Sequence, residues 1–504
     1  MQIEPAPDVF AQRYAKGTAQ VVWTTLVADL ETPVSAFLKI AGSKPMSFLL
    51  ESVEGGAVRG RYSIIGLDPD VVWRSNGGGA EINRTPHAPA AFVPCAGTPL
   101  AALRAFVAES CIDLPDGLPP MAAGVFGYLG YDMVRQMEEL APPNPDPIGV
   151  PDAILVRPMV VVIFDAVKDT MTVVTPVRPA SPVSSDVALA RAVERLTAVV
   201  DSLDRPLDQE AAVSIDGPLH TTAVSNTTAD EFERMVLKGK DYIAAGDIFQ
   251  VVLAQRFELP FTLPPFALYR ALRRVNPAPF LFFLDYGSFA VAGSSPEILV
   301  RVRDGTVTIR PLAGTRPRGA TPHEDKALED ELLADPKERA EHLMLLDLGR
   351  NDVGRVAKIG SVAVTDQFFI ERFSQVMHIV SNVEGALDAS HDALDALIAG
   401  FPAGTVSGAP KVRAMEIIDE LEKEKRGIYA GCVGYFSAAG DLDSCIVLRT
   451  ALVKDGRMYV QAGAGIVADS NPAAEQQECI NKAKALFRAA EEARRFASSA
   501  RRGQ

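Results

Sequence analysis

The segment DPKERAEH at residues 335–342 and the segment NPAAEQQE at residues 471–478 each place two glutamates three positions apart, just after a proline. Asp and Asn are good N-cap residues and proline suits the first helical position, so each segment predicts the start of a helix. Residues three apart share one helical face, and each helix can therefore aim two carboxylates in one direction. If the two helix starts meet in the fold, four carboxylates come together: Glu338, Glu341, Glu475 and Glu478.

Such a group of carboxylates predicts a metal site. The charges repel one another unless a cation lies between them, and ligand sets made only of oxygen suit Mg²⁺ best. Mg²⁺ usually keeps several waters and bridges to an anionic ligand, so an anionic substrate is expected as well. Each pair alone has a structural reading, because Glu338 stands where a capping box places its acid and negative charge stabilises a helix start. The occurrence of two matching pairs favours the metal site.

The composition is that of a soluble globular enzyme. The chain has 504 residues, 48% hydrophobic and 23% charged, enough for two or three domains or one large core with a lid. Its net charge of −14 and the lack of a basic stripe argue against binding of nucleic acid or of an anionic membrane. The five cysteines form no Cys-x-x-Cys pair, and the sequence has neither a signal-peptide pattern nor a membrane-spanning apolar run. We therefore expect a cytoplasmic protein without a disulfide framework.

Changes in composition divide the chain into four parts. These are an N-terminal lid or regulatory region (20–180), a connecting segment (181–226), a catalytic region (227–490) and a tail (491–504). In the first part, residues 159–165 and 171–177 predict a pair of strands. In the connecting segment, residues 184–186 predict the start of a helix that extends to about Leu203.

The register of one hairpin can be predicted from its turn. Asp304-Gly305 between two alternating runs is a strong signal for a two-residue type I′ turn. Such a turn pairs Arg303 with Thr306, and counting outward places Glu297 beside Leu312.

A second hairpin turns at Asp455-Gly456, and the same counting places Arg449 opposite Ala462. Gly463 and Gly465 follow, and glycine lets backbone N–H groups approach a ligand closely. An arginine beside such groups is a plausible receptor for a carboxylate. The alternative is that the two glycines mark a β-bulge and that Arg449 forms a surface ion pair.

Several strings in residues 227–490 are typical of one family. They are GDIFQVVLAQR at 246–256, SSPE at 294–297, PLAGTRPRG at 311–319, KERAEHLMLLDLGRND at 337–352, HIVS at 378–381, GTVSGAPK at 404–411, RGIYAGCVGY at 426–435, CIVLRT at 445–450 and QAGAGIVADS at 461–470. With these strings in this order, the chain resembles the chorismate-utilising enzymes, and specifically the anthranilate synthase component I family. The LLES segment at 49–52 matches that family's regulatory motif.

The resemblance implies a fold and a reaction. The fold is of the α+β class, with large β-sheets packed face to face, helices outside and strands from both halves of the chain. The reaction is Mg²⁺-dependent conversion of chorismate and ammonia to anthranilate and pyruvate. This is the first committed step of tryptophan biosynthesis, and the resemblance implies feedback inhibition by tryptophan.

The resemblance also implies roles for individual residues. Glu297 matches the general acid that protonates the departing ring hydroxyl. His378 matches a histidine associated with the loss of pyruvate, and the alternative is a hydrogen-bonded histidine at a strand end. Glu341 and Glu478 match the magnesium-binding positions, with Glu338 and Glu475 close by or acting through water. The substrate-contacting positions are Gly314, Thr315, Tyr429, Arg449, Gly463, Ala464 and Gly465, with Lys482 as a further candidate.

Two positions favour anthranilate formation over related reactions. Relatives that add water carry a lysine base where Gln250 stands, and glutamine has no useful basicity. Aminodeoxychorismate synthases commonly carry a lysine nucleophile in place of Ala313, which cannot form a covalent adduct. Aminodeoxychorismate formation is the nearest alternative. An alternative of another class is a catalytically silent tryptophan-binding regulator, which would be marked by loss of the acids at the metal positions.

A partner and a second site are also implied. No Gly-x-Cys-x-Gly motif surrounds any of the five cysteines, so we expect a separate glutamine amidotransferase (glutaminase) subunit to supply ammonia. The resemblance implies a heterotetramer with two copies of each subunit. It implies a tryptophan site formed by the LLES motif and the segment NPAPFL at 276–281, with the contact residues Glu51, Ser52, Pro279, Phe280 and Leu281. In this site Glu51 can pair with the ligand's ammonium group. Phe280 and Leu281 replace the Tyr and Met common in the family, which keeps an apolar pocket but removes a hydroxyl.

Overall fold

The computed structural model describes residues 1–42, 44–54, 58–86, 91–180, 182–207, 222–373 and 376–497. Residues 208–221 of the expected connecting segment and residues 498–504 of the expected tail therefore lie outside the described residues. The division into four parts stays a prediction.

The two glutamate-bearing segments begin helices, as predicted. These are α8 (Pro336–Gly354) and α11 (Pro472–Glu492), each with proline in its first turn. The Asp335 side chain accepts hydrogen bonds from the first amides of α8, and the Asn471 side chain accepts one from the Ala474 amide. These side chains satisfy N–H groups that have no partner inside the helix. The predicted helix of the connecting segment is α4 (Ser185–Leu203), capped by Ser184.

The strands form two layers joined by two long strands, β3 (Val58–Asn76) and β7 (Ala153–Asp165). The β3–β7 register shifts between Pro69 and Val71, and the two halves of these strands pair with different neighbours. The first layer contains β9 (Val224–Ser225), β10 (Gln250–Pro260), β22 (Arg457–Ile466), β21 (Thr450–Lys454), β12 (Phe289–Ser295), β11 (Phe280–Asp285), β2 (Ser47–Glu54), β8 (Thr170–Val177), β1 (Gln20–Val27) and β18 (Gly408–Ala409). The second contains β5 (Phe92–Pro94), β4 (Gly79–Asn83), β6 (Gly124–Leu129), β19 (Cys432–Ser437), β20 (Leu442–Ile446), β13 (Ile298–Arg303), β14 (Thr306–Ile309), β17 (Val376–Ala386), β15 (Leu312–Pro317) and β16 (Ala363–Arg372).

Aromatic side chains fill the space between the layers. Phe48 of β2 stacks on Phe126 of β6 with ring centroids 4.7 Å apart. Tyr128 of β6 meets Tyr286, at the end of β11, edge-on at 5.6 Å. Because β2 and β11 belong to the first layer and β6 to the second, the layers pack face to face around a shared core.

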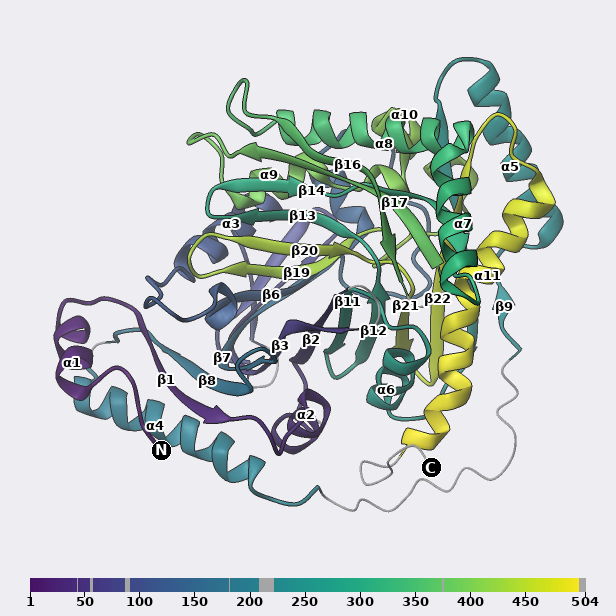
Figure 1. The fold of residues 1–504 in the computed structure, drawn as a ribbon. Coiled ribbons are helices and arrows are strands. Elements are labelled where there is room, and N and C mark those ends of the chain that lie inside the picture. Colours follow the sequence, from purple (N-terminus) through teal and green to yellow (C-terminus); the bar gives the residue numbers. More distant parts are fainter. Residues whose placement is uncertain are drawn as a thin grey trace.

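Helices cover the outer faces of both layers (Figure 1). The apolar cluster outside the first layer includes α4, α11, α1 (Pro7–Ala15), α2 (Pro33–Ile40) and α6 (Pro265–Val275). A second apolar cluster includes α8, α3 (Pro99–Glu109) and α9 (Ala393–Gly400), which lie over the second layer. It also includes α5 (Ala229–Ala244) and α10 (Lys411–Leu421), which both contact β10. α7 (Pro322–Ala334) packs on β15 and β17, and the short 3₁₀ turns are η1 (Pro120–Ala122), η2 (Tyr131–Gln136), η3 (Gly404–Val406) and η4 (Ala493–Phe496). The predicted α+β fold, with helices outside the stacked sheets, is confirmed.

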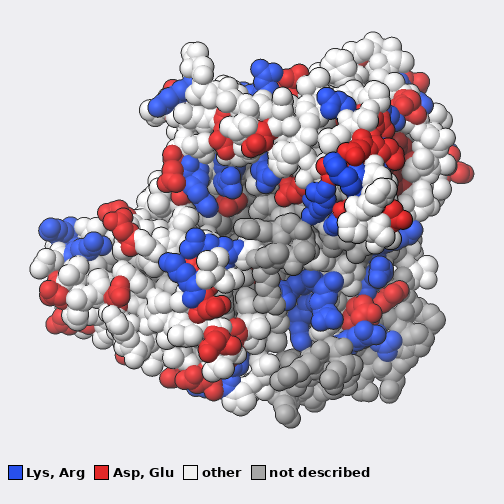
Figure 2. Space-filling view, in the orientation of Figure 1, with Lys and Arg blue, Asp and Glu red and all other residues white. Residues whose placement is uncertain are grey.

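Acidic and basic side chains gather on different helices of this outer layer. Figure 2 shows acidic side chains gathered over α7 and basic ones gathered over α6. In the described part of the chain, no helix combines the length and the apolar composition that are needed to cross a membrane.

The first predicted hairpin is confirmed. The turn at 304–305 has positive φ at both residues, and Arg303 pairs with Thr306. Further out, the backbone amide of Leu312 donates a hydrogen bond to Glu297, which stands between β12 and β13. The counting from the turn therefore placed these two residues correctly.

The second hairpin has the predicted turn, with φ of 50° at Asp455 and 74° at Gly456. Pairing of β21 with β22 runs from this turn as far as Ala451. Arg449 lies just beyond the paired part, with a left-handed φ of 46°, instead of in a regular strand pair. This conformation is uncommon for a residue with a side chain.

Candidate functional site

The first turns of α8 and α11 lie side by side. Lys337 Nζ, on α8, is 3.0 Å from Asp469 Oδ2, just before α11. Burial raises the pKa of the Glu341 carboxyl, and the charges of Glu338 and Glu478 raise it further. The convergence predicted from the two helix starts is therefore present.

Two of these carboxylates are held by basic side chains. Arg316 Nη1 donates to Glu338 Oε1 at 2.9 Å, and Lys482 Nζ lies 2.7 Å from Glu478 Oε1. Within the described ranges, no three His, Cys, Asp or Glu side chains are arranged to hold a metal ion. Mg²⁺ usually takes only one or two protein carboxylates and completes its shell with water and substrate oxygens. Glu341 and Glu478 fit that requirement, because a cation beside them would relieve the repulsion that raises the pKa of Glu341.

Glu475 is the remaining acid of the predicted set. Burial raises its pKa, as does the charge of Glu478, whereas a hydrogen bond from Ser470 acts in the opposite direction. Ser470 is itself fixed, because its carbonyl oxygen accepts a hydrogen bond from Lys240 Nζ at 2.7 Å. Glu475 therefore interacts with the loop that leads into α11 as well as with the other acids.

Glu297 is a buried carboxylic acid, 6% exposed, and it lines an open hollow together with Leu345 and Leu348 of α8 and Thr405 of η3. The hydroxyl of Thr405 lies 3.2 Å from both of its carboxyl oxygens, and the amide of Leu312 also donates to it. Burial raises the pKa of Glu297 to about 8, although both hydrogen bonds act to lower it. The group is therefore protonated near neutral pH and can serve as a general acid.

Thr405 is a site residue that the sequence analysis did not single out. It belongs to the GTVSGAPK string, which was used only to support the family resemblance. The hydroxyl in that string was the available signal, but its partner Glu297 lies 108 positions away in the chain.

His378, on β17, faces β15 and is held through one ring nitrogen. Its Nδ1 is 2.9 Å from the carbonyl oxygen of Gly314 and 3.0 Å from Thr315 Oγ1. Burial lowers the pKa of His378 to about 4, so the ring is neutral. An Nδ1–H that donates to the carbonyl leaves Nε2 as an acceptor, and this buried atom has no partner among the described residues. The geometry therefore leaves Nε2 as an unused hydrogen-bond acceptor.

The glycines of β22 lie in a regular strand. β10 and β22 pair from Val251–Ile466 to Pro260–Arg457 without a register shift, so Gly463 and Gly465 mark no bulge. Ala464, between them, is fully buried in the core.

The glycines are needed because other side chains occupy the adjacent space. A Cβ at Gly463 would lie 2.9 Å from the Tyr429 hydroxyl, and one at Gly465 would lie 2.7 Å from Gln250 Nε2. Gln250 Nε2 also donates to Glu341 Oε1 at 3.1 Å. Gln250 thus links β22, the strand that contains Gly463 and Gly465, to Glu341 on α8. The sequence analysis did not predict this contact.

Arg449 carries a half-buried guanidinium to which no described residue supplies a counter-charge. Burial lowers its pKa, and within the described part of the chain its side chain forms no hydrogen bond or ion pair. Its charge also lowers the pKa of His378. The expected alternative of a surface ion pair is wrong, and the side chain remains available to an anion. Lys482 adds a second cation nearby, with Nζ 3.0 Å from the carbonyl oxygen of Gly463.

The residues expected to bind tryptophan lie on neighbouring strands. β2 and β11 pair Glu51 with Leu281 and Ser52 with Phe280. Because side chains alternate along a strand, Leu281 contributes to the outer apolar cluster, whereas Phe280 packs against the core between the layers. Pro279 immediately precedes β11.

Glu51 has partners within the chain. Its carboxylate accepts hydrogen bonds from Arg273 at 2.7 and 2.9 Å and from the Tyr269 hydroxyl, both on α6. An ammonium group would have to share this carboxylate with Arg273. The Ser52 hydroxyl donates to the carbonyl oxygen of Tyr62 at 3.1 Å.

Comparison with known proteins identifies the family. Residues 59–488 match the family model described as chorismate binding enzyme. The chain is 57% identical over 500 residues to "Anthranilate synthase component 1" of Cereibacter sphaeroides, covering 98% of this chain and 99% of that protein. It is 49% identical over 475 residues to the protein of the same name from Pseudomonas putida, covering 92% and 93%. The crystal structure of anthranilate synthase component I from Streptococcus pneumoniae TIGR4 has a TM-score of 0.75 and 38% identity, covering 92% of this chain and 98% of that chain. The chain therefore belongs to the chorismate-binding enzymes and, within them, to the anthranilate synthase component 1 family.

Proposed function

We propose that this chain converts chorismate and ammonia to anthranilate and pyruvate, with Mg²⁺ as cofactor, in the first committed step of tryptophan biosynthesis. The observation that carries the proposal is the buried Glu297 carboxyl, which is held by the Thr405 hydroxyl and the Leu312 amide and whose pKa is raised by burial. The names of the relatives support the same reaction class.

Substrate binding uses the charged side chains around β22. Chorismate carries two carboxylates, and the guanidinium of Arg449, which has no ion-pair partner among the described residues, binds one of them in a partly desolvated site. The main chain at Gly314, Gly463 and Gly465 and the side chains of Thr315, Tyr429 and Lys482 complete the proposed contacts. Mg²⁺, held by Glu341 and Glu478 with Glu338 and Glu475 close by, would neutralise the second carboxylate and fix its position.

The first chemical step uses Glu297. An allylic hydroxyl is a poor leaving group until it is protonated, so Glu297 donates its proton as the ring C–O bond breaks and water leaves. Ammonia adds at a carbon of the allylic system. The carboxylate that Glu297 becomes is stabilised by the Thr405 hydroxyl and the Leu312 amide, which lowers the free energy of the charged form.

The second step uses His378, whose Nε2 has no hydrogen-bond partner among the described residues. This nitrogen takes the proton from the ring carbon that bears the new amine, and the C–O bond between the ring and the enolpyruvyl group breaks. The released enolpyruvate then takes up a proton from solvent on its methylene carbon and becomes pyruvate. Aromatisation of the ring provides the driving force. Gln250, which stands where a base for water would be needed, is engaged with Glu341 and has no useful basicity. Ala313 offers no nucleophile.

We also propose a partner and an inhibitor. A glutaminase subunit supplies ammonia within a cytoplasmic heterotetramer containing two copies of each subunit, and the "component 1" in the relatives' names supports a second component. Tryptophan binds at Glu51, Ser52, Pro279, Phe280 and Leu281, and the adjacency of β2 and β11 supports a common site.

Turnover by the purified chain tests the reaction. With chorismate, Mg²⁺ and ammonium, we expect fluorescent anthranilate and an equal amount of pyruvate, loss of both with EDTA, and inhibition by added tryptophan. An aminated product without pyruvate would instead indicate aminodeoxychorismate formation. Tryptophan binding without any turnover would indicate a silent regulator, and either result would refute the proposal.

Substitution of Arg449→Gln should raise the KM for chorismate about 10- to 100-fold, since a hydrogen bond to a charged group contributes about 1.5–3 kcal/mol. Steady-state kinetics with ammonium as the amine donor measure this effect. Arg457→Gln is a matched control, because Arg457 forms an exposed ion pair with Glu258 in the same hairpin. An unchanged KM for chorismate in the Arg449 variant would exclude the proposed carboxylate contact.

A further inference from the structure

The turn that follows α10, residues 422–427, carries a buried arginine, Arg426. Arg426 is 3% exposed, and its guanidinium contacts both carboxylate oxygens of Glu422. Burial disfavours the charge, but the paired carboxylate keeps the pKa of Arg426 above its usual value. The side chain therefore stays charged although it is buried.

The other N–H groups of Arg426 hold backbone from two separate segments. Nη1 donates to the carbonyl oxygen of Val406 at 2.6 Å, and Nη2 donates to the carbonyl oxygen of Val252 at 2.7 Å. Val406 directly follows Thr405 in η3, and Val252 lies in β10 two residues after Gln250. One guanidinium thus ties the segment that contacts Glu297 to the strand that contacts Glu341.

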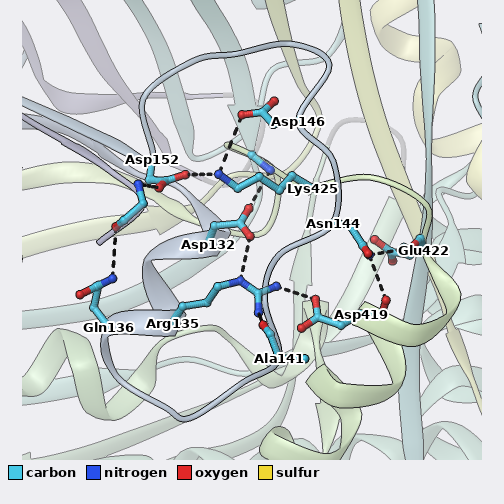
Figure 3. Close-up of polar contacts among 12 residues, drawn as sticks. Asp132, Arg135, Gln136, Ala141, Asn144, Asp146, Asp152, Asp419, Glu422 and Lys425 are labelled. Atoms are coloured by element: carbon cyan, nitrogen blue, oxygen red, sulfur yellow. Dashed lines mark hydrogen bonds and ion pairs between the residues drawn. The ribbon is translucent and has the colours of Figure 1, made fainter. Parts of the chain in front are cut away.

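The turn is also held from outside by the N-terminal half of the chain (Figure 3). Arg135 Nη2 is 2.7 Å from Asp419 Oδ1, and Lys425 Nζ is 2.6 Å from Asp152 Oδ1. Asn144 Nδ2 donates to the carbonyl oxygens of Asp419 and Glu422 at 2.9 and 2.7 Å.

Aromatic rings restrict the guanidinium further. Its central carbon lies 4.9 Å from the ring centroid of Tyr131, in η2, and 5.6 Å from that of Tyr429. These contacts and the hydrogen bonds leave Arg426 no freedom to shift without moving its partners.

We propose that Arg426 is a positioning residue for the reaction given under the proposed function. By fixing the carbonyl of Val406, it places the Thr405 hydroxyl against Glu297, although Arg426 itself does not touch Glu297. A buried ion pair adds little net stability compared with well-packed apolar side chains. The hydrogen bonds of Arg426 therefore serve to fix a geometry. A Thr405 hydroxyl held in place stabilises the Glu297 carboxylate when its proton leaves.

A double-mutant cycle tests the proposal. Arg426→Lys keeps the charge, but an ammonium on a flexible stem cannot reproduce the planar fork that spans Glu422 and the two carbonyls. We expect kcat to fall about tenfold, with the KM for chorismate changed less than about twofold. Thr405→Val should reduce kcat to a similar degree. The kcat of the double variant should lie within about twofold of that of either single variant, because two residues that act through one contact give non-additive effects.

The control is Arg413→Lys, the same substitution on α10 at an exposed pair with Asp247 and Glu416, where kcat should not change. If the fold losses of kcat from Arg426→Lys and Thr405→Val multiply in the double variant, Arg426 does not act through Thr405. An unchanged kcat per folded molecule would overturn the proposal in the same way.

A second variant covers the case in which Arg426→Lys does not fold. Asn144→Ala removes the outer hydrogen bonds to the turn at a half-buried position, and we expect a two- to threefold lower kcat that disappears in the Thr405→Val background. If kcat is unchanged in Asn144→Ala and Arg426→Lys is unfolded, the proposal is rejected. Failure of the proposed function is a separate result, because the unmodified chain would then give no anthranilate.

Discussion

The substitution Glu297→Gln should lower the kcat for anthranilate formation about 1,000-fold, within the range of about 10²–10⁴ that general acid catalysis contributes. Glutamine keeps the size of the side chain and can still receive a hydrogen bond from Thr405, but it has no proton to give to the leaving hydroxyl. Stopped or continuous fluorescence of anthranilate, with ammonium as donor, measures the loss. Chorismate binding should persist, because the proposed carboxylate contacts lie at Arg449 and beside Glu341.

The pH dependence of the unmodified enzyme tests the same assignment. Burial raises the pKa of Glu297 to about 8, and the protonated form is the active one. kcat/KM for chorismate should therefore be constant below pH 8 and fall tenfold per pH unit above it. The concentration of free NH₃ must be held constant, because the fraction of ammonium that is deprotonated rises with pH. A carboxyl with an ordinary pKa would give a decline that begins several units lower.

Glu384→Gln is a control for the exchange of glutamate for glutamine itself, since Glu384 lies on β17 and its side chain accepts a hydrogen bond from Asn382. It should leave both the rate and the pH profile unchanged. A Glu297→Gln variant with more than a tenth of the normal kcat would refute the role of Glu297 as the acid.

The substitution Glu341→Gln should abolish Mg²⁺-dependent turnover, with a loss of at least about 100-fold. Removing one charge from a site that binds Mg²⁺ through one or two carboxylates should greatly weaken the ion. Titration calorimetry with Mg²⁺, or electron paramagnetic resonance with Mn²⁺ in its place, measures binding independently of activity. We expect the ion to bind the unmodified chain and to be lost from the variant.

Asp347→Asn provides a control on the same helix. Asp347 forms an exposed i,i+3 ion pair with Arg350, so metal binding and turnover should not change. Full activity of Glu341→Gln, with normal Mg²⁺ affinity, would show that the acids at the starts of α8 and α11 serve the structure and not a metal.

Local features of this protein could be predicted because their causes are local. The side chains of Asp335 and Asn471 accept hydrogen bonds from amides two or three residues away, so the starts of α8 and α11 follow from a few adjacent residues. The turns at 304–305 and 455–456 require positive φ at two neighbouring positions, and this fixes the register close to the turn.

Counting residue pairs outward from a hairpin turn predicts their positions only over a limited distance. Counting from the first turn placed Glu297 beside the Leu312 amide, whereas Arg449 adopts a left-handed conformation outside the paired strands. The difference arises because hydrogen bonds to more distant segments, such as that from the Ser294 amide to the carbonyl of Arg449, act on the chain once the ladder ends.

The residues along the chain are enough to locate the starts of the acidic helices, the turns of the two hairpins and the family that the motifs resemble. Three features follow only from the packed fold: Thr405 meets Glu297, no described residue gives Arg449 a counter-charge, and Arg426 ties η3 to β10. Caps and turns depend on hydrogen bonds between near neighbours, and these form wherever the chain lies. The pKa of a buried carboxyl and the pairing of a guanidinium depend on groups that are distant in the chain, and those groups become neighbours only when the two sheet layers and their helices have packed together.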